Sequence, residues 1–133
     1  PDWRVDLYGE GQERNLLIDI IERHNMHKQV SLHAPCSNIK ERLLESSIYA
    51  FPSRSDGFGL VITEAMECGL PTVAMDCECG PREIITPNTG IVVPDRNIDA
   101  FAKALERLMT DDQLRLTMGY AATQRVKHSI RRI

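Results

Sequence analysis

The sequence lacks the features that several common protein classes require. Its longest apolar runs are too short to span a bilayer, and acidic residues slightly outnumber basic ones, so that the formal net charge is −3. The short apolar runs predict no transmembrane helix, and the charge balance gives no electrostatic reason to expect a nucleic-acid partner. The first residues also do not form a basic and apolar leader. We therefore expect a cytoplasmic protein.

The chain has few cysteines, and their spacing favours neither a disulfide framework nor a metal site. They are Cys36, Cys68, Cys77 and Cys79. Cysteine ligands of zinc are usually separated by about two to four residues and followed by a second pair or by histidines at a similar interval. Only one residue separates Cys77 from Cys79, and no such second pair follows. We expect free, reduced thiols, no metal and no cofactor.

What the sequence does contain is typical of an α/β protein. Its 133 residues, 42% hydrophobic and 26% charged, suit a single domain with a real core. Short apolar runs alternate with amphipathic segments, which indicates parallel strands joined by right-handed helical crossovers. We predict strands at 5–8, 30–34, 48–51, 71–75 and 89–93, and helices around 16–21, 39–44, 59–68, 98–108 and 111–128, with a short helix after residue 80. The predicted fold is a Rossmann-like parallel sheet with helices on both faces.

Residues 52–71, PSRSDGFGLVITEAMECGLP, are the most informative segment. They place Asp56 and Glu64 eight positions apart, around a glycine-flanked turn that opens an amphipathic helix. The first N–H groups of a helix have no partner within it and lie at the positive end of its dipole. Backbone amides near Gly59 are therefore suited to an anionic diphosphate, and glycines let a ligand approach the backbone closely.

The two carboxylates suit sugar hydroxyls. Glu64 lies about one and a half turns into the predicted helix and faces back toward its start, where it can accept hydrogen bonds from the vicinal hydroxyls of a ribose. Asp56, on the loop before the helix, can accept from the hydroxyls of a second sugar. The segment therefore predicts a site for a sugar joined to a phosphate.

This segment resembles the nucleotide-sugar-binding, C-terminal domain of the retaining GT-B glycosyltransferases of family four, whose signature holds two Glu residues around Gly-Phe-Gly-Leu. The order of elements fits over residues 6–109, although Asp56 replaces the first Glu and Ala34 stands where the family usually has Gly. The resemblance implies that Glu64 holds the ribose and Asp56 a donor-sugar hydroxyl, without a metal. It also implies that backbone N–H groups of Gly57, Phe58, Gly59 and Leu60 line the donor sugar and phosphates. Arg54, on the same loop, is a further candidate for contact with a phosphate or sugar.

The resemblance also implies parts beyond this chain. Residues 1–9 resemble a segment that follows the first βα unit in the family. In the family, that first unit carries the basic residues that neutralise the diphosphate. We expect that unit and an acceptor-binding domain to be absent here, and this polypeptide alone to be inactive. The acceptor would be a glycan or a lipid-linked sugar, with peripheral placement at the inner membrane face through the missing domain. Residues 76–85 resemble surface-polysaccharide transferases of bacteria and favour a UDP-linked donor.

Plainer interpretations stay open. Glu64 can be a solvent-facing helix acid, Asp56 the start of a turn, Phe58 a core residue and Arg54 a solvated charge. For the whole chain, the alternatives are a nucleotide-sugar epimerase or a phosphorylase on the same fold, and a noncatalytic nucleotide-binding α/β module.

Overall fold

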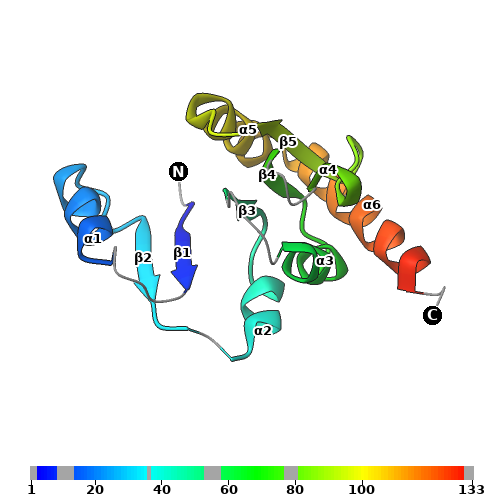
Figure 1. The fold of residues 1–133 in the computed structure, drawn as a ribbon, viewed down its shortest axis with the longest axis horizontal. Coiled ribbons are helices and arrows are strands. Elements are labelled where there is room, and N and C mark those ends of the chain that lie inside the picture. The colour runs from blue at the N-terminus through cyan, green and yellow to red at the C-terminus, as the bar shows by residue number, and fades with distance from the viewer. Residues whose placement is uncertain (1–2, 9–13, 36, 53–57, 77–80, 131–133) are drawn as a thin grey trace. The chain divides into compact units, whose positions relative to one another are not determined.

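The computed structural model describes residues 3–8, 14–35, 37–52, 58–76 and 81–130, excluding the side chains of residues 58–60, 82 and 128–130. The chain divides into two compact units, residues 1–39 and 40–133. Both are built from parallel strands and helices, as the alternating pattern predicts (Figure 1). The organisation of all 133 residues as a single domain stays a prediction.

The first unit is one βαβ motif. Strand β1 (Val5–Tyr8) is followed by helix α1 (Arg14–Arg23) and strand β2 (Val30–His33). The two strands are parallel, with Val5 opposite Val30 and Tyr8 opposite His33. Both strands lie where the apolar runs predict them.

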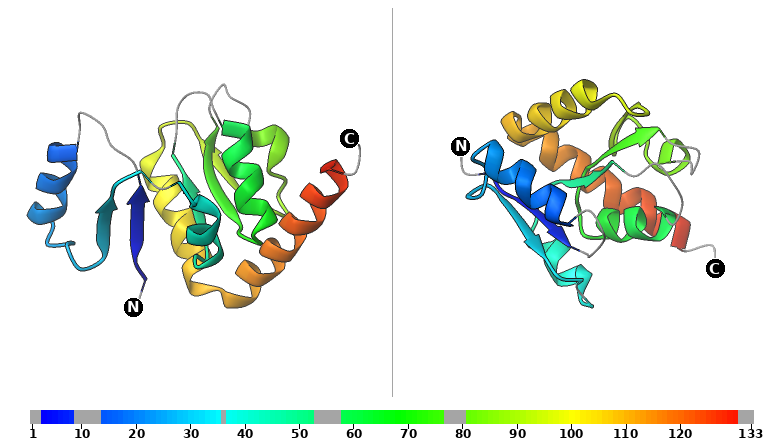
Figure 2. Two further views of the ribbon diagram at one scale, coloured as in Figure 1. Left: turned by 90° about the horizontal axis from the view of Figure 1, so that it is seen from below. Right: turned by 60° about the vertical axis from the view of Figure 1, so that its left-hand side comes forward.

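The second unit is a three-stranded parallel sheet with helices around it (Figures 1 and 2). The strand order is β3-β4-β5, so β4 is the central strand. The elements are α2 (Ile39–Leu44), β3 (Tyr49–Phe51), α3 (Phe58–Glu67), β4 (Thr72–Asp76), α4 (Pro81–Ile84), β5 (Gly90–Pro94), α5 (Ile98–Thr110) and α6 (Asp112–Ile130).

Helices cover both faces of this sheet because β4 is apolar on both sides, as expected for a central parallel strand. Ala74 belongs to a cluster with Ile62 of α3 and Ala122 of α6. Val73, on the opposite face, belongs to a second cluster with Leu108 of α5. Successive strand residues point to opposite faces, so β4 contributes to both cores.

The helix ends follow their local sequence signals. The side chain of Asn97 accepts a hydrogen bond from the N–H of Ala100 and caps α5. Gly69, two residues after the end of α3, has a φ of +79°, a conformation that ends a helix and that glycine adopts without strain. Over the described ranges, no helix is both long enough and apolar enough to cross a membrane.

Candidate functional site

The predicted diphosphate-binding segment lies at the junction between β3 and α3. Strand β3 ends at Phe51 and helix α3 begins at Phe58, so the motif opens a helix as predicted. Phe58, Gly59 and Leu60 form the first turn of α3. Arg54, Asp56 and Gly57 lie outside the described residues, and their roles stay predictions.

The first turn of α3 is electrostatically suited to an anion. Its N–H groups have no acceptor one turn earlier in the helix, and no acidic residue occupies this turn. The helix has ten residues, which is long enough for a developed dipole. The turn therefore presents partial positive charge that no carboxylate of its own neutralises.

Glu64 follows in the second turn of α3 and is half-buried. Its neighbours Ile62, Ala65 and Met66 are buried in the core, so packing fixes the helix that carries the carboxylate. By contrast, Glu67 at the end of the same helix is exposed. Because Glu64 is half-buried on a fixed helix, its position favours a binding role over the alternative of a solvent-facing helix acid.

Tyr49 on β3 lies near Glu64, a relationship that the sequence analysis missed. Burial, and then the negative charge of Glu64, raise the pKa of the Tyr49 phenol to about 12. Tyr49 packs beside the core cluster that contains Phe51 and Ile62. Strand alternation, which places Tyr49 and Phe51 on the same face, was the available signal.

The other end of α3 is held by α6. The turn that ends α3 is closed by hydrogen bonds from the N–H groups of Gly69 and Leu70 to the carbonyl oxygens of Met66 and Ala65. Gly119 of α6 packs directly on the carbonyl group of Gly69. This close approach requires a residue without Cβ and sets the position of α3 against α6.

Helix α4, which follows β4, is a second candidate part of the site, because ligands of parallel sheets bind beyond the carboxyl ends of the strands. The strand ends at half-buried Asp76, and α4 begins at the buried Pro81. Arg125 of α6 donates hydrogen bonds to the carbonyl oxygens of Ile84 and Glu83, at 2.6 and 2.9 Å. Helix α6 therefore contacts both the end of α3, which follows β3, and α4, which follows β4.

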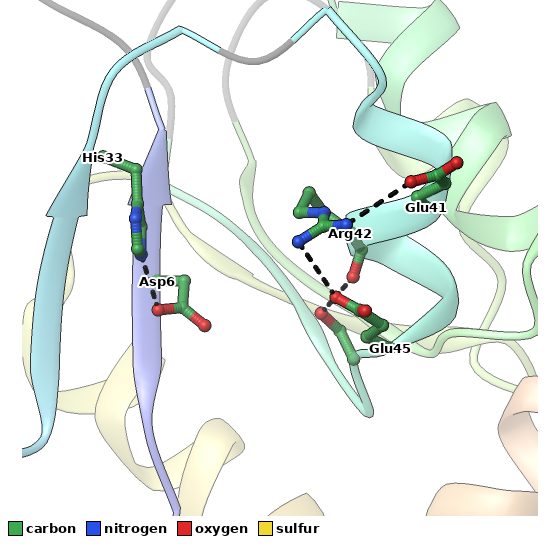
Figure 3. Close-up of polar contacts among 6 residues, drawn as sticks. Asp6, His33, Glu41, Arg42 and Glu45 are labelled. Atoms are coloured by element: carbon green, nitrogen blue, oxygen red, sulfur yellow. Dashed lines mark hydrogen bonds and ion pairs between the residues drawn. The ribbon is translucent and has the colours of Figure 1, made fainter.

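In the first unit, polar side chains meet across β1 and β2 (Figure 3). His33 donates from Nε2 to Asp6 Oδ1 at 2.9 Å, and its ring stacks on Tyr8 with centroids 4.6 Å apart. These contacts indicate a structural role for His33 within the first unit. Figure 3 also shows Arg42 of α2 paired with Glu41 and Glu45, at 3.4 and 3.3 Å.

Cys68, directly after α3, is the cysteine that the structure describes. Burial raises the pKa of the Cys68 thiol, opposed by Lys40 and assisted by Glu67 and Glu64, which disfavours the nucleophilic thiolate. Within the described ranges, no three His, Cys, Asp or Glu residues gather as ligands of a metal ion. The other three cysteines lie outside those ranges.

The family model described as glycosyl transferases group 1 matches residues 1–125. The chain belongs to this family. The fold is that of the GT-B glycosyltransferases, as predicted, with parallel strands and helices on both sides.

Two curated relatives connect the family to polysaccharides. The chain is 34% identical over 124 residues to an exopolysaccharide phosphotransferase of Streptomyces coelicolor, and 32% identical over 122 residues to the amylovoran biosynthesis glycosyltransferase AmsD of Erwinia amylovora. Each match covers 92% of this chain. The chain spans only 13% and 34% of the lengths of these two proteins.

Two solved structures with similar folds contain UDP. A TarM mutant from S. aureus, in complex with fondaparinux, alpha-GlcNAc-glycerol and UDP, has a TM-score of 0.87 and 27% identity over 92% of this chain and 25% of its own. The pneumococcal O-GlcNAc transferase GtfA, in complex with UDP and GlcNAc, has a TM-score of 0.82 and 26% identity over 94% of this chain and 26% of its own.

Proposed function

We propose that this chain is the donor-binding part of a retaining glycosyltransferase of family four. The full protein would transfer a sugar from a UDP-linked donor to a glycan or lipid-linked acceptor, in the synthesis of bacterial surface polysaccharide. The family membership supports transferase chemistry. The UDP in two similar structures supports the donor class, and the amylovoran relative supports the pathway class.

The observation that carries this proposal is the position of Glu64 relative to the start of α3. A first turn without acidic residues and a half-buried carboxylate in the second turn lie on one helix, whose inner face is fixed in the core. An anion at the first turn and hydroxyl groups at the carboxylate are the two chemical features of a nucleoside diphosphate. In this arrangement Glu64 accepts hydrogen bonds from the ribose.

The backbone at the start of α3 contributes to the reaction as well as to binding. Negative charge builds on the departing diphosphate as the bond to the anomeric carbon breaks. Fixed amide dipoles at Phe58, Gly59 and Leu60 stabilise that charge more in the transition state than in the ground state. Asp56 would hold a donor-sugar hydroxyl and orient the anomeric carbon, and neither carboxylate acts as a general base.

Mutations in the full protein test these roles. We expect Asp56→Ala and Glu64→Ala to reduce donor turnover by about 100-fold or more, within the range for groups that position a reacting substrate. Glu67→Ala is the matched control, since Glu67 is exposed on the same helix. Turnover is measured with a panel of nucleotide sugars, and the configuration of the product reports retention.

The result that rejects the role of Glu64 is equal donor turnover by Glu64→Ala, Glu67→Ala and wild type. A product isomerised at the sugar without transfer would indicate an epimerase instead. Because the chain spans a minority of the length of its relatives, we expect no transfer by this polypeptide alone. Transfer above background by the isolated chain would contradict that expectation.

A further inference from the structure

We propose that Arg125 of α6 is a positioning residue for donor binding, because its guanidinium group fixes α4 at the carboxyl end of β4. This inference rests on the proposed function, since it assigns α4 to one side of the donor site. It concerns a residue that the sequence motif does not contain.

The contact joins two segments that are distant in the sequence. Arg125 donates from Nε to the carbonyl oxygen of Ile84 at 2.6 Å and from Nη2 to that of Glu83 at 2.9 Å. The last carbonyl groups of a helix have no partner within it, and positive charge is favourable at that end. The planar guanidinium can hold two successive carbonyl groups at once, which a single ammonium group does less well.

Helix α4 depends on such outside contacts because it is one turn long. Its four residues are closed by a hydrogen bond from the N–H of Ile85 to the carbonyl oxygen of Pro81, at 2.8 Å. A single turn is not stable in isolation. Pro81 and Ile85 are buried and anchor its two ends, while Arg125 holds the carbonyl groups between them and so fixes the rotation of the turn.

The location of α4 connects Arg125 to the donor. Ligands of open parallel sheets bind beyond the carboxyl ends of the strands, and α4 begins five residues after Asp76, where central strand β4 ends. Helix α4 also contacts α3, the helix that bears Glu64. A displaced α4 would therefore disturb the helix that holds the ribose.

Arg115 provides a matched control on the same helix. It also donates from a guanidinium nitrogen to a carbonyl oxygen, that of Leu108, at 2.7 Å. That bond joins α6 to α5 rather than to α4. If arginines of α6 serve stability alone, substitutions at Arg115 and Arg125 will affect nucleotide binding alike.

The test is calorimetric titration of the full protein with UDP, for wild type, Arg125→Met, Arg125→Lys and Arg115→Met. We expect Arg125→Met to weaken UDP binding by about tenfold, while Arg115→Met stays within about twofold of wild type. Arg125→Lys should fall between wild type and Arg125→Met, because its ammonium group can reach one of the two carbonyl oxygens. Thermal unfolding of each variant measures how much stability each substitution removes, so that effects on binding and on stability can be compared.

Equal UDP affinities for Arg125→Met and Arg115→Met would overturn the inference. If Arg125→Met does not fold, Arg125→Lys and Arg115→Lys provide the same comparison, and equal affinities there would also overturn it. Wild type is also titrated with GDP and ADP, because failure of the proposed function gives a different result, in which wild type binds none of the three nucleotides.

Discussion

Gly119 of α6 packs on the carbonyl group of Gly69, the residue that ends α3. A Cβ atom at position 119 would lie well under 3.0 Å from that carbonyl oxygen, a separation that real Cβ atoms essentially never show. The two helices can approach this closely only because one of them has a glycine at the contact. The contact fixes the helix that carries Glu64, so packing far from the predicted ligand determines the geometry of the site.

Gly119→Ala is expected to destabilise the protein, although helix propensity predicts the opposite. Alanine in place of glycine within a helix gains about 1 kcal/mol where space allows. Here the added methyl group overlaps backbone atoms, and overpacking of this kind costs about 1–3 kcal/mol or more. Chemical denaturation of the full protein measures the change, with Lys127→Ala, at an exposed position of α6, as the control. A more stable Gly119→Ala variant would show that α6 does not pack on Gly69.

Thr72→Val is expected to stabilise the protein. Thr72, at the start of β4, is fully buried, and its hydroxyl group has no hydrogen-bond partner among the residues that the structure describes. Replacing a buried, unsatisfied hydroxyl by a methyl group of similar size should gain about 1 kcal/mol in the free energy of unfolding.

Thr89→Val is the matched control, with the opposite expected sign. The Thr89 hydroxyl is also buried, but it accepts a hydrogen bond from the N–H of Thr86 at 2.9 Å. Its removal should cost about 1–3 kcal/mol. The same denaturation experiment measures both variants, and a loss of stability in Thr72→Val would contradict the account of Thr72.

The raised pKa of Tyr49 predicts a loss of stability at high pH. The phenol titrates at about 12 in the folded protein, against an ordinary value of 10.0. The unfolded chain therefore releases this proton first as the pH rises. The contribution is fully present below pH 10 and is lost as the pH rises toward 12. Free energies of unfolding for wild type and Tyr49→Phe, measured across this range, should show a steeper decline for wild type. Parallel curves would mean that Tyr49 titrates normally.

The sequence was sufficient to predict the elements of the fold because their signals are local. The alternation of apolar runs located strands β1 to β5, whose bounds agree with the predicted ranges to within one residue. The motif also located the start of α3, because glycines and a following amphipathic pattern mark a helix that begins at a turn.

The supporting contacts of the site were not predictable from the sequence, because they join residues far apart in the chain. The sequence around Gly119 does not indicate that this residue contacts Gly69. The sequence around Arg125 likewise does not distinguish it from any other charged residue on a helix. The proximity of Tyr49 to Glu64 depends on how α3 packs over β3. Strand alternation predicts which face of β3 carries Tyr49, but it does not predict where α3 lies on that face.

The central claim is that Glu64 accepts hydrogen bonds from the ribose of a bound nucleotide, and a double-mutant cycle with a modified ligand tests it most directly. Calorimetry measures the affinities of UDP and 2′-deoxy-UDP for the full protein, as wild type, Glu64→Gln and Glu67→Gln. We predict that wild type and Glu67→Gln prefer UDP by about tenfold, or about 1.4 kcal/mol, and that Glu64→Gln binds the two nucleotides almost equally. An undiminished preference for UDP in Glu64→Gln would contradict the claim.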